Sequence, residues 1–146
     1  MKIGILGGTF NPIHKGHVGL ARQIKKKLQL DKIIFVPVYL PPHKKGQGIV
    51  SADDRLKMTK LAVRGIKGLS VSDLEIKRKG KSYSVDTLKI LKNKFKGSLL
   101  YFIVGADSLS ELDKWKNIDE IFKLANFVVA SRPGFLKGHL TPKASW

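Results

Sequence analysis

Two histidines, His14 and His17, stand three residues apart at the end of the segment Gly7 to His17, whose sequence is GGTFNPIHKGH. Its glycines allow the backbone to come close to a ligand, and Pro12 stiffens the segment. Helical spacing of apolar residues begins directly afterwards, so both imidazoles would lie on one face of a first helical turn. Free N–H groups and the positive end of the helix dipole face the same way. This arrangement suits a triphosphate, and it could stabilise a phosphorus under attack without a protein nucleophile.

Other phosphate-binding and metal-binding patterns fail in this sequence. Gly80-Lys81-Ser82 imitates the end of a P-loop, but Glu75 occupies the place of its first glycine. The glycines of the first strand do not form the dinucleotide-binding pattern. The chain has no cysteine, and its four histidines lack a metalloprotease spacing, so we expect no metal held by side chains. The alternative interpretation of the histidine pair is that His14 caps a loop and His17 packs in the core.

Strand-like and helix-like segments alternate along the chain. Apolar runs predict strands over residues 2–6, 32–37, 69–76, 99–104 and 127–130. Amphipathic spacing predicts helices over 16–30, from Ser51, from Ser82 or Ser84, and within 107–124. In the second of these helices the predicted apolar side carries Leu56, Leu61 and Ala62. The alternation predicts a Rossmann-like α/β fold, a parallel five-stranded sheet with helices on both faces. We expect one domain over residues 1–146, with ligands bound at the carboxyl ends of the strands.

Composition narrows the classes of partner. The chain has 28 Lys and Arg against 11 Asp and Glu, a formal net charge of +17, which favours anionic ligands. The lysines are spread over nearly every segment without interleaved aromatic residues, so we interpret them as solvated helix faces and do not expect nucleic acid. No apolar run is long enough to span a bilayer. We therefore expect no membrane partner and, with no cysteine, a cytoplasmic location.

The histidine segment resembles the H-x-G-H signature of nucleotidyltransferases, and specifically that of the bacterial nicotinate mononucleotide adenylyltransferase family. The first motif alone is shared with pantetheine-phosphate adenylyltransferases and cytidylyltransferases. Further matches narrow the resemblance, which covers about residues 1–135: Pro41 to Lys44, Lys81 to Thr87, Phe102 to Ser108, Trp115, and Ser131 to Gly134.

This resemblance implies that ATP and nicotinate mononucleotide react, with Mg²⁺, to give deamido-NAD and pyrophosphate. It implies an ATP site lined by Gly8, Thr9, Phe10, His14, His17 and Asp107. His14 and His17 would be the catalytic residues of this set, and Asp107 would face the ribose. It implies an acceptor site with Lys44 at the phosphate and with Ser84 and Trp115 around the ring.

The sequence departs from the family pattern at several places. Asn11 stands where Asp is usual, Val38 where Asn is common, and Lys116 where an aromatic residue is common. Family members also continue to an Ile-Ser-Ser/Ala-Thr-x-x-Arg segment that opens a further helix, and residues 135–146 do not match it. Without that helix, we expect apolar surface around residues 127–130 to be open to water or to a partner chain, which could make the protein a homo-oligomer.

Three alternative functions follow from these observations. One is nucleotidyl transfer to another phosphorylated acceptor. A second is a weakly active or non-catalytic nucleotide-binding relative, for which the unmatched tail is the evidence. The third and weakest is a basic nucleic-acid binder, whose affinity would depend steeply on salt.

Overall fold

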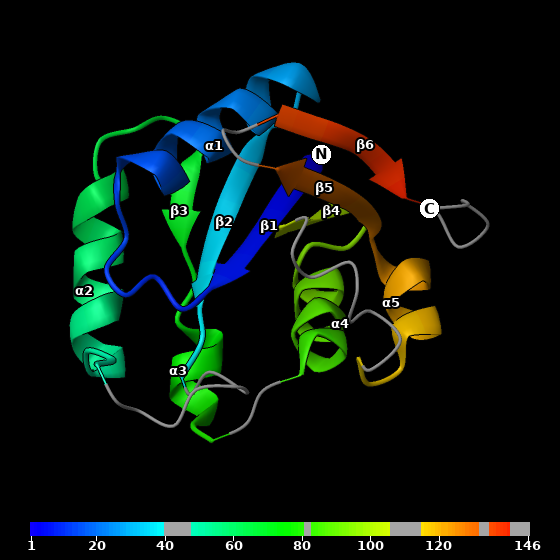
Figure 1. Ribbon diagram of the computed structural model, residues 1–146. Coiled ribbons are helices and arrows are strands. Elements are labelled where there is room, and N and C mark those ends of the chain that lie inside the picture. Colours follow the sequence, from blue (N-terminus) through cyan, green and yellow to red (C-terminus); the bar gives the residue numbers. More distant parts are fainter. Residues whose placement is uncertain (40–47, 81–82, 106–114, 132–134, 141–146) are drawn as a thin grey trace.

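The central sheet of the protein has the strand order β3-β2-β1-β4-β5-β6 (Figure 1). The computed structural model describes residues 1–39, 48–80, 83–105, 115–131 and 135–140. Five strands run parallel: β1 (Lys2–Gly8), β2 (Lys32–Pro37), β3 (Leu69–Val71), β4 (Leu99–Gly105) and β5 (Asn126–Ser131). The predicted parallel five-stranded sheet is therefore confirmed, and β1 lies at its centre.

A sixth strand, β6 (Phe135–Leu140), pairs antiparallel with β5 and was not predicted. The expectation of open apolar surface around residues 127–130 was wrong, because these four side chains are at most 4% exposed. Phe127 and Val129 pack in one core cluster, whereas Val128 and Ala130 pack in the other. Both faces of β5 are thus covered within the described chain, and β6 covers its edge.

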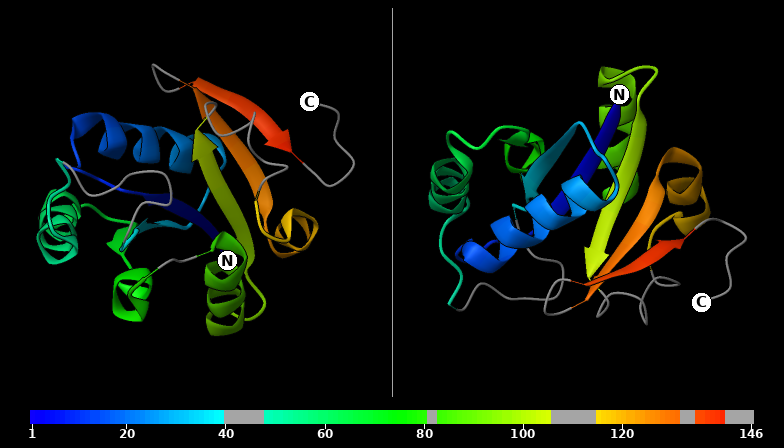
Figure 2. Two further views of the ribbon diagram at one scale, coloured as in Figure 1. Left: turned by 60° about the horizontal axis from the view of Figure 1, so that its bottom comes forward. Right: turned by 90° about the horizontal axis from the view of Figure 1, so that it is seen from above.

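Helices cover both faces of the sheet, as the sequence predicts (Figure 2). One face packs against α1 (Lys15–Lys27) and α2 (Ala52–Val63). The other face packs against α3 (Leu74–Arg78), α4 (Ser84–Lys94) and α5 (Ile118–Leu124). No helix in the described part of the chain is long and apolar enough to cross a membrane.

The strands are apolar on both sides because each side meets a helical layer. In β2, for example, Ile33 and Phe35 enter the cluster under α1 and α2. Ile34 and Val36 enter the cluster on the opposite face. This double burial explains why the strands appear in the sequence as continuous apolar runs rather than as alternating ones.

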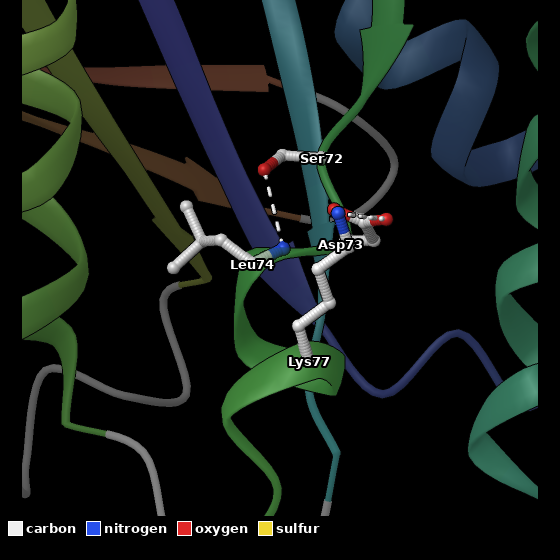
Figure 3. Close-up of polar contacts among 4 residues, drawn as sticks. All are labelled: Ser72, Asp73, Leu74 and Lys77. Carbon is white, nitrogen blue, oxygen red and sulfur yellow. Dashed lines mark hydrogen bonds and ion pairs between the residues drawn. The ribbon is translucent and has the colours of Figure 1, made fainter.

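The third strand is shorter than predicted, because a local hydrogen bond ends it (Figure 3). The backbone N–H of Ser72 still donates to Phe35 O at 2.8 Å. The Ser72 hydroxyl then accepts from the N–H of Leu74 at 3.4 Å, and α3 begins there. Lys77 and Asp73 form an ion pair of 3.4 Å across the first turn of this helix. Serine hydroxyls compete with strand pairing in this way, so the predicted strand 69–76 gives way to a helix.

The buried stripe of α2 also differs from the prediction. Ser51 caps the helix as expected, accepting from the N–H of Asp54 at 3.2 Å. Leu61, however, is 64% exposed. The side that packs inward carries Arg55, Thr59 and Val63, so a charged residue occupies a core-facing position of this helix.

Hydrogen bonds among three side chains join α3 to α4. The hydroxyl of Thr87 donates to Oε2 of Glu75 at 2.7 Å, and a guanidinium N–H of Arg78 donates to the same hydroxyl at 2.7 Å. Glu75 and Thr87 are both buried. These bonds fix the first turn of α4, which begins at Ser84.

We predict a pH-dependent stability that originates at Glu75. Desolvation raises the pKa of the Glu75 carboxyl, and the bond from Thr87 and the charge of Arg78 oppose that shift. The folded state therefore keeps this proton at pH values where the unfolded state has lost it. The Glu75 contribution to the free energy of unfolding should consequently fall as pH rises above the ordinary value of about 4.5.

The measurement is urea denaturation of wild type and Glu75→Gln between about pH 4.5 and about pH 8. The stability difference, wild type minus variant, should decrease as the pH rises from about 4.5 and level off once the pH passes the raised pKa of Glu75. Glu120→Gln, at a partly exposed carboxyl, is the control for removing a charge. A difference for Glu75→Gln that stays constant with pH would contradict the assignment.

Candidate functional site

Two histidine side chains close the first turn of α1. The backbone N–H of Gly16 donates to Nδ1 of His14 at 3.0 Å, and the N–H of His14 donates to Nδ1 of His17 at 3.1 Å. The two rings lie 3.9 Å apart between centroids, with 33° between their planes. The structure therefore brings the predicted pair together as a reciprocal cap, a role that Ser and Glu usually fill.

This cap uses the same nitrogen of each ring. Nδ1 of both imidazoles accepts a backbone hydrogen bond, so these two bonds set the orientation of both rings at the start of α1. The first turn of α1 holds no acidic residue, so nothing there offsets the positive end of the helix dipole.

Two glycines, Gly16 and Gly8, lie too close to the His14 and Phe10 rings to be replaced by a larger residue without a shift. A Cβ on Gly16 would lie 2.8 Å from Cε1 and 2.9 Å from Nδ1 of His14. A Cβ on Gly8 would lie 3.2 Å from the ring of Phe10. Phe10 is buried, has a positive φ of 48°, and meets His17 edge to face with 5.2 Å between centroids. Gly8 thus leaves room for the ring of Phe10, which packs against His17.

The side chain of Asn11 joins the loop to the segment before α2. Its amide nitrogen donates to Gly48 O at 2.7 Å, and its amide oxygen accepts from the N–H of Val50 at 2.8 Å. Asn11, which replaces the usual Asp of the family pattern, uses both ends of its amide. A carboxylate could make only the second of these bonds.

Arg55 is the residue of this region that the sequence analysis missed. Its side chain is 1% exposed and donates four hydrogen bonds to backbone carbonyls. The acceptors are Val50 O at 2.8 Å, Thr9 O at 2.8 Å, Val38 O at 2.7 Å and Tyr39 O at 2.9 Å. Burial lowers the pKa of its guanidinium, which nonetheless stays charged. The regular spacing of Arg55, Thr59 and Val63, four residues from each to the next, was the available signal, but a buried helix face is normally recognised by apolar residues.

The predicted acceptor residues Ser84 and Trp115 lie on the face of the sheet that packs against α3, α4 and α5. Ser84 opens α4, and Trp115 contacts the rings of Phe102 and Phe127 at 5.9 and 6.3 Å between centroids. The ammonium of Lys116 lies 4.6 Å from the centroid of the Tyr83 ring. This contact brings the neighbours of Trp115 and Ser84 together in space.

Two predicted site residues, Lys44 and Asp107, lie outside the described residues. Among the others, Gly8, Thr9, Phe10, His14 and His17 come together at the end of β1. The start of α4 belongs to the same edge of the sheet, because that helix runs back to the amino end of β4. In the part of the chain that the structure describes, no three His, Cys, Asp or Glu side chains gather as a metal site would require.

Comparison with known proteins gives consistent matches. Residues 5–145 match the family model described as cytidylyltransferase-like. A Clostridium perfringens protein named "Probable nicotinate-nucleotide adenylyltransferase" is 48% identical over 139 residues, which are 95% of this chain and 69% of that protein. A Citrifermentans bemidjiense protein of the same name is 46% identical over 134 residues, 92% of this chain and 62% of that protein.

A solved structure shares the fold. Plasmodium falciparum nicotinic acid mononucleotide adenylyltransferase, complexed with NaAD, matches with a TM-score of 0.77 at 22% sequence identity. The match covers 92% of this chain and 66% of that one.

We predict that two glycines of α1 respond oppositely to alanine. Gly19→Ala should raise the free energy of unfolding by about 0.5–1 kcal/mol, the usual gain in a helix, because a Cβ there meets nothing within 4 Å. Gly16→Ala should lose this gain and also weaken the His14 cap, which is worth about 0.5–2 kcal/mol. Urea denaturation of the two variants measures the difference, and equal stabilisation by both would show that His14 does not occupy the position described.

Proposed function

Because the chain belongs to the cytidylyltransferase-like family, and within it to the nicotinate-nucleotide adenylyltransferases, we propose that it joins ATP to nicotinate mononucleotide. An oxygen of the mononucleotide 5′-phosphate attacks the α-phosphorus of ATP and forms a new P–O bond. The bond between that phosphorus and the oxygen bridging to the β-phosphate breaks. The products are deamido-NAD and pyrophosphate.

The observation that carries the proposal is the reciprocal histidine cap at the start of α1. The cap holds two imidazoles, together with the positive end of the α1 dipole, at the carboxyl end of the central strand, where ligands bind in such sheets. The imidazoles of His14 and His17 would interact with phosphate oxygens, and those interactions would strengthen as charge builds up in the transition state. No protein nucleophile is needed, since positioning and charge stabilisation supply most of the catalysis.

The remaining roles follow the family pattern. Gly8, Thr9 and Phe10 would line the ATP site, and Asp107 would face its ribose. Lys44 would meet a phosphate of the acceptor, while Ser84 and Trp115 would surround its ring. The contact between Lys116 and Tyr83 supports this placement, because it holds the segments of Trp115 and Ser84 side by side.

Magnesium would enter with ATP. Mg²⁺ prefers phosphate and water oxygens and often keeps few protein ligands, which fits the absence of an acidic or histidine cluster among the described residues. When bound, the ion neutralises phosphate charge. The protein's own part is then to hold and orient the nucleotide.

The experiment that tests the proposal is pyrophosphate release by the purified chain with ATP and each candidate acceptor. Nicotinate mononucleotide should give turnover, and omission of the acceptor should abolish it. Turnover with a different phosphorylated acceptor alone would replace the substrate, and binding of ATP without turnover would identify a non-catalytic relative.

We predict that His17→Ala lowers the rate of adenylyl transfer about 10²–10³-fold at saturating ATP, the scale of losing one preorganised donor. Lys26→Ala, at an exposed residue near the other end of α1, is the control and should keep the wild-type rate. The fold should survive both changes, as circular dichroism can verify. Near-normal turnover of the His17 variant would remove the pair from the mechanism.

We also predict a preference for the acidic acceptor. A ring carboxylate accepts hydrogen bonds from backbone N–H groups, whereas a carboxamide turns its own NH₂ donor toward them. An unpaired buried donor costs about 1–3 kcal/mol, so kcat/KM should favour nicotinate over nicotinamide mononucleotide by about tenfold or more. Equal kcat/KM for the two acceptors would contradict this assignment of the ring pocket.

A further inference from the structure

We propose that Arg55 is a positioning residue for the loop between β1 and α1, residues 9–14, and holds Thr9 and its neighbours in the geometry that ATP requires. The inference rests on the proposed function for its ligand and on the hydrogen bonds of Arg55 for its mechanism. Arg55 lies on α2 and belongs to none of the motifs that define the site.

The guanidinium of Arg55 ties three separate segments together. One Nη atom donates both to Thr9 O, in the loop after β1, and to Val38 O, just past β2. The other Nη donates to Tyr39 O, and Nε donates to Val50 O before α2. The backbone N–H of Val38 also donates to Gly8 O at 3.0 Å. The ends of β1 and β2 are therefore clamped to each other and to α2.

The hydrogen bonds of Arg55 also affect the position of His17, through Thr9 and Phe10. Thr9 precedes Phe10, whose φ of 48° turns its ring into the core between Phe35 and His17. A bulky residue such as phenylalanine rarely adopts a positive φ unless its surroundings hold it there. Because Arg55 fixes the carbonyl directly before that turn, it determines where the ring lies beneath His17.

A planar fork is needed for this role. Four N–H groups of one guanidinium diverge toward four carbonyls, whereas an ammonium has three donors at a single point. No carboxylate of a described residue pairs with Arg55, so the backbone oxygens alone compensate its buried charge. A buried ion is a poor source of stability compared with an apolar side chain, and this favours a role in geometry.

The test compares Arg55→Lys with Val63→Ala. Val63 lies two turns further along the same buried stripe, and its truncation destabilises α2 without touching the loop. The readouts are melting temperature, hydrogen exchange of the Val38, Val50 and His14 amides, and kcat/KM for ATP. These three amides donate the bonds that hold the loop.

At a comparable loss of melting temperature, Arg55→Lys should exchange these amides at least about tenfold faster than Val63→Ala. It should also lower kcat/KM for ATP by about 10²-fold, the scale of a misplaced reacting group, while Val63→Ala should stay within about threefold of wild type. Equal exchange and equal kcat/KM in the two variants would overturn the proposal. If the wild type releases no pyrophosphate, the proposed function fails, and the exchange rates still decide the role of Arg55.

If Arg55→Lys does not fold, the wild-type protein provides the measurement. The Nε–H of Arg55 should exchange slowly with water and shift in the NMR spectrum when ATP is added. Arg64, exposed at the end of α2, should do neither. Rapid exchange of the Arg55 signal, or a signal unmoved by bound ATP, would overturn the inference.

Discussion

The geometry of the candidate site depends on one buried positive charge. Taking a guanidinium out of water costs several kcal/mol unless its N–H groups find partners, and Arg55 finds four backbone carbonyls. Those carbonyls belong to three segments that are distant in sequence. None of the segments can shift alone without leaving a buried donor unpaired, so the loop after β1, the end of β2 and the start of α2 behave as one unit.

The histidine cap is a second constraint on the candidate site, because the side chains that begin α1 are also the candidate catalytic residues. An ordinary Ser or Asp cap satisfies the first N–H groups of a helix and does nothing more. Here His14 and His17 satisfy two N–H groups through Nδ1. The bonds that start α1 therefore also set the tilt of both rings, which lie 3.9 Å apart between centroids.

Sequence patterns predicted the parts of this protein that local chemistry determines. The continuous apolar runs correctly predicted five parallel strands, and the GGTFNPIHKGH segment correctly predicted that His14 and His17 share the first turn of a helix. The end of β3 was missed because one hydroxyl of Ser72 decides it. The strand β6 was missed because its pairing with β5 is antiparallel and its sequence, FLKGHL, shows no clear alternation. Arg55 was missed because its partners are backbone carbonyls, which no side-chain pattern displays.

Asn11 is a second residue whose role depends on backbone partners that the sequence does not reveal. As a sequence feature it is a mild departure from Asp at one position of the family pattern. In the structure its amide nitrogen reaches Gly48 O and its amide oxygen receives the N–H of Val50, while Val50 O receives a bond from Arg55. The loop between β1 and α1 is therefore bonded to residues 48–50 directly through the Asn11 side chain and indirectly through Arg55. An acidic residue at position 11 would lose the donor to Gly48, so the amide is matched to the segment that this chain places beside it.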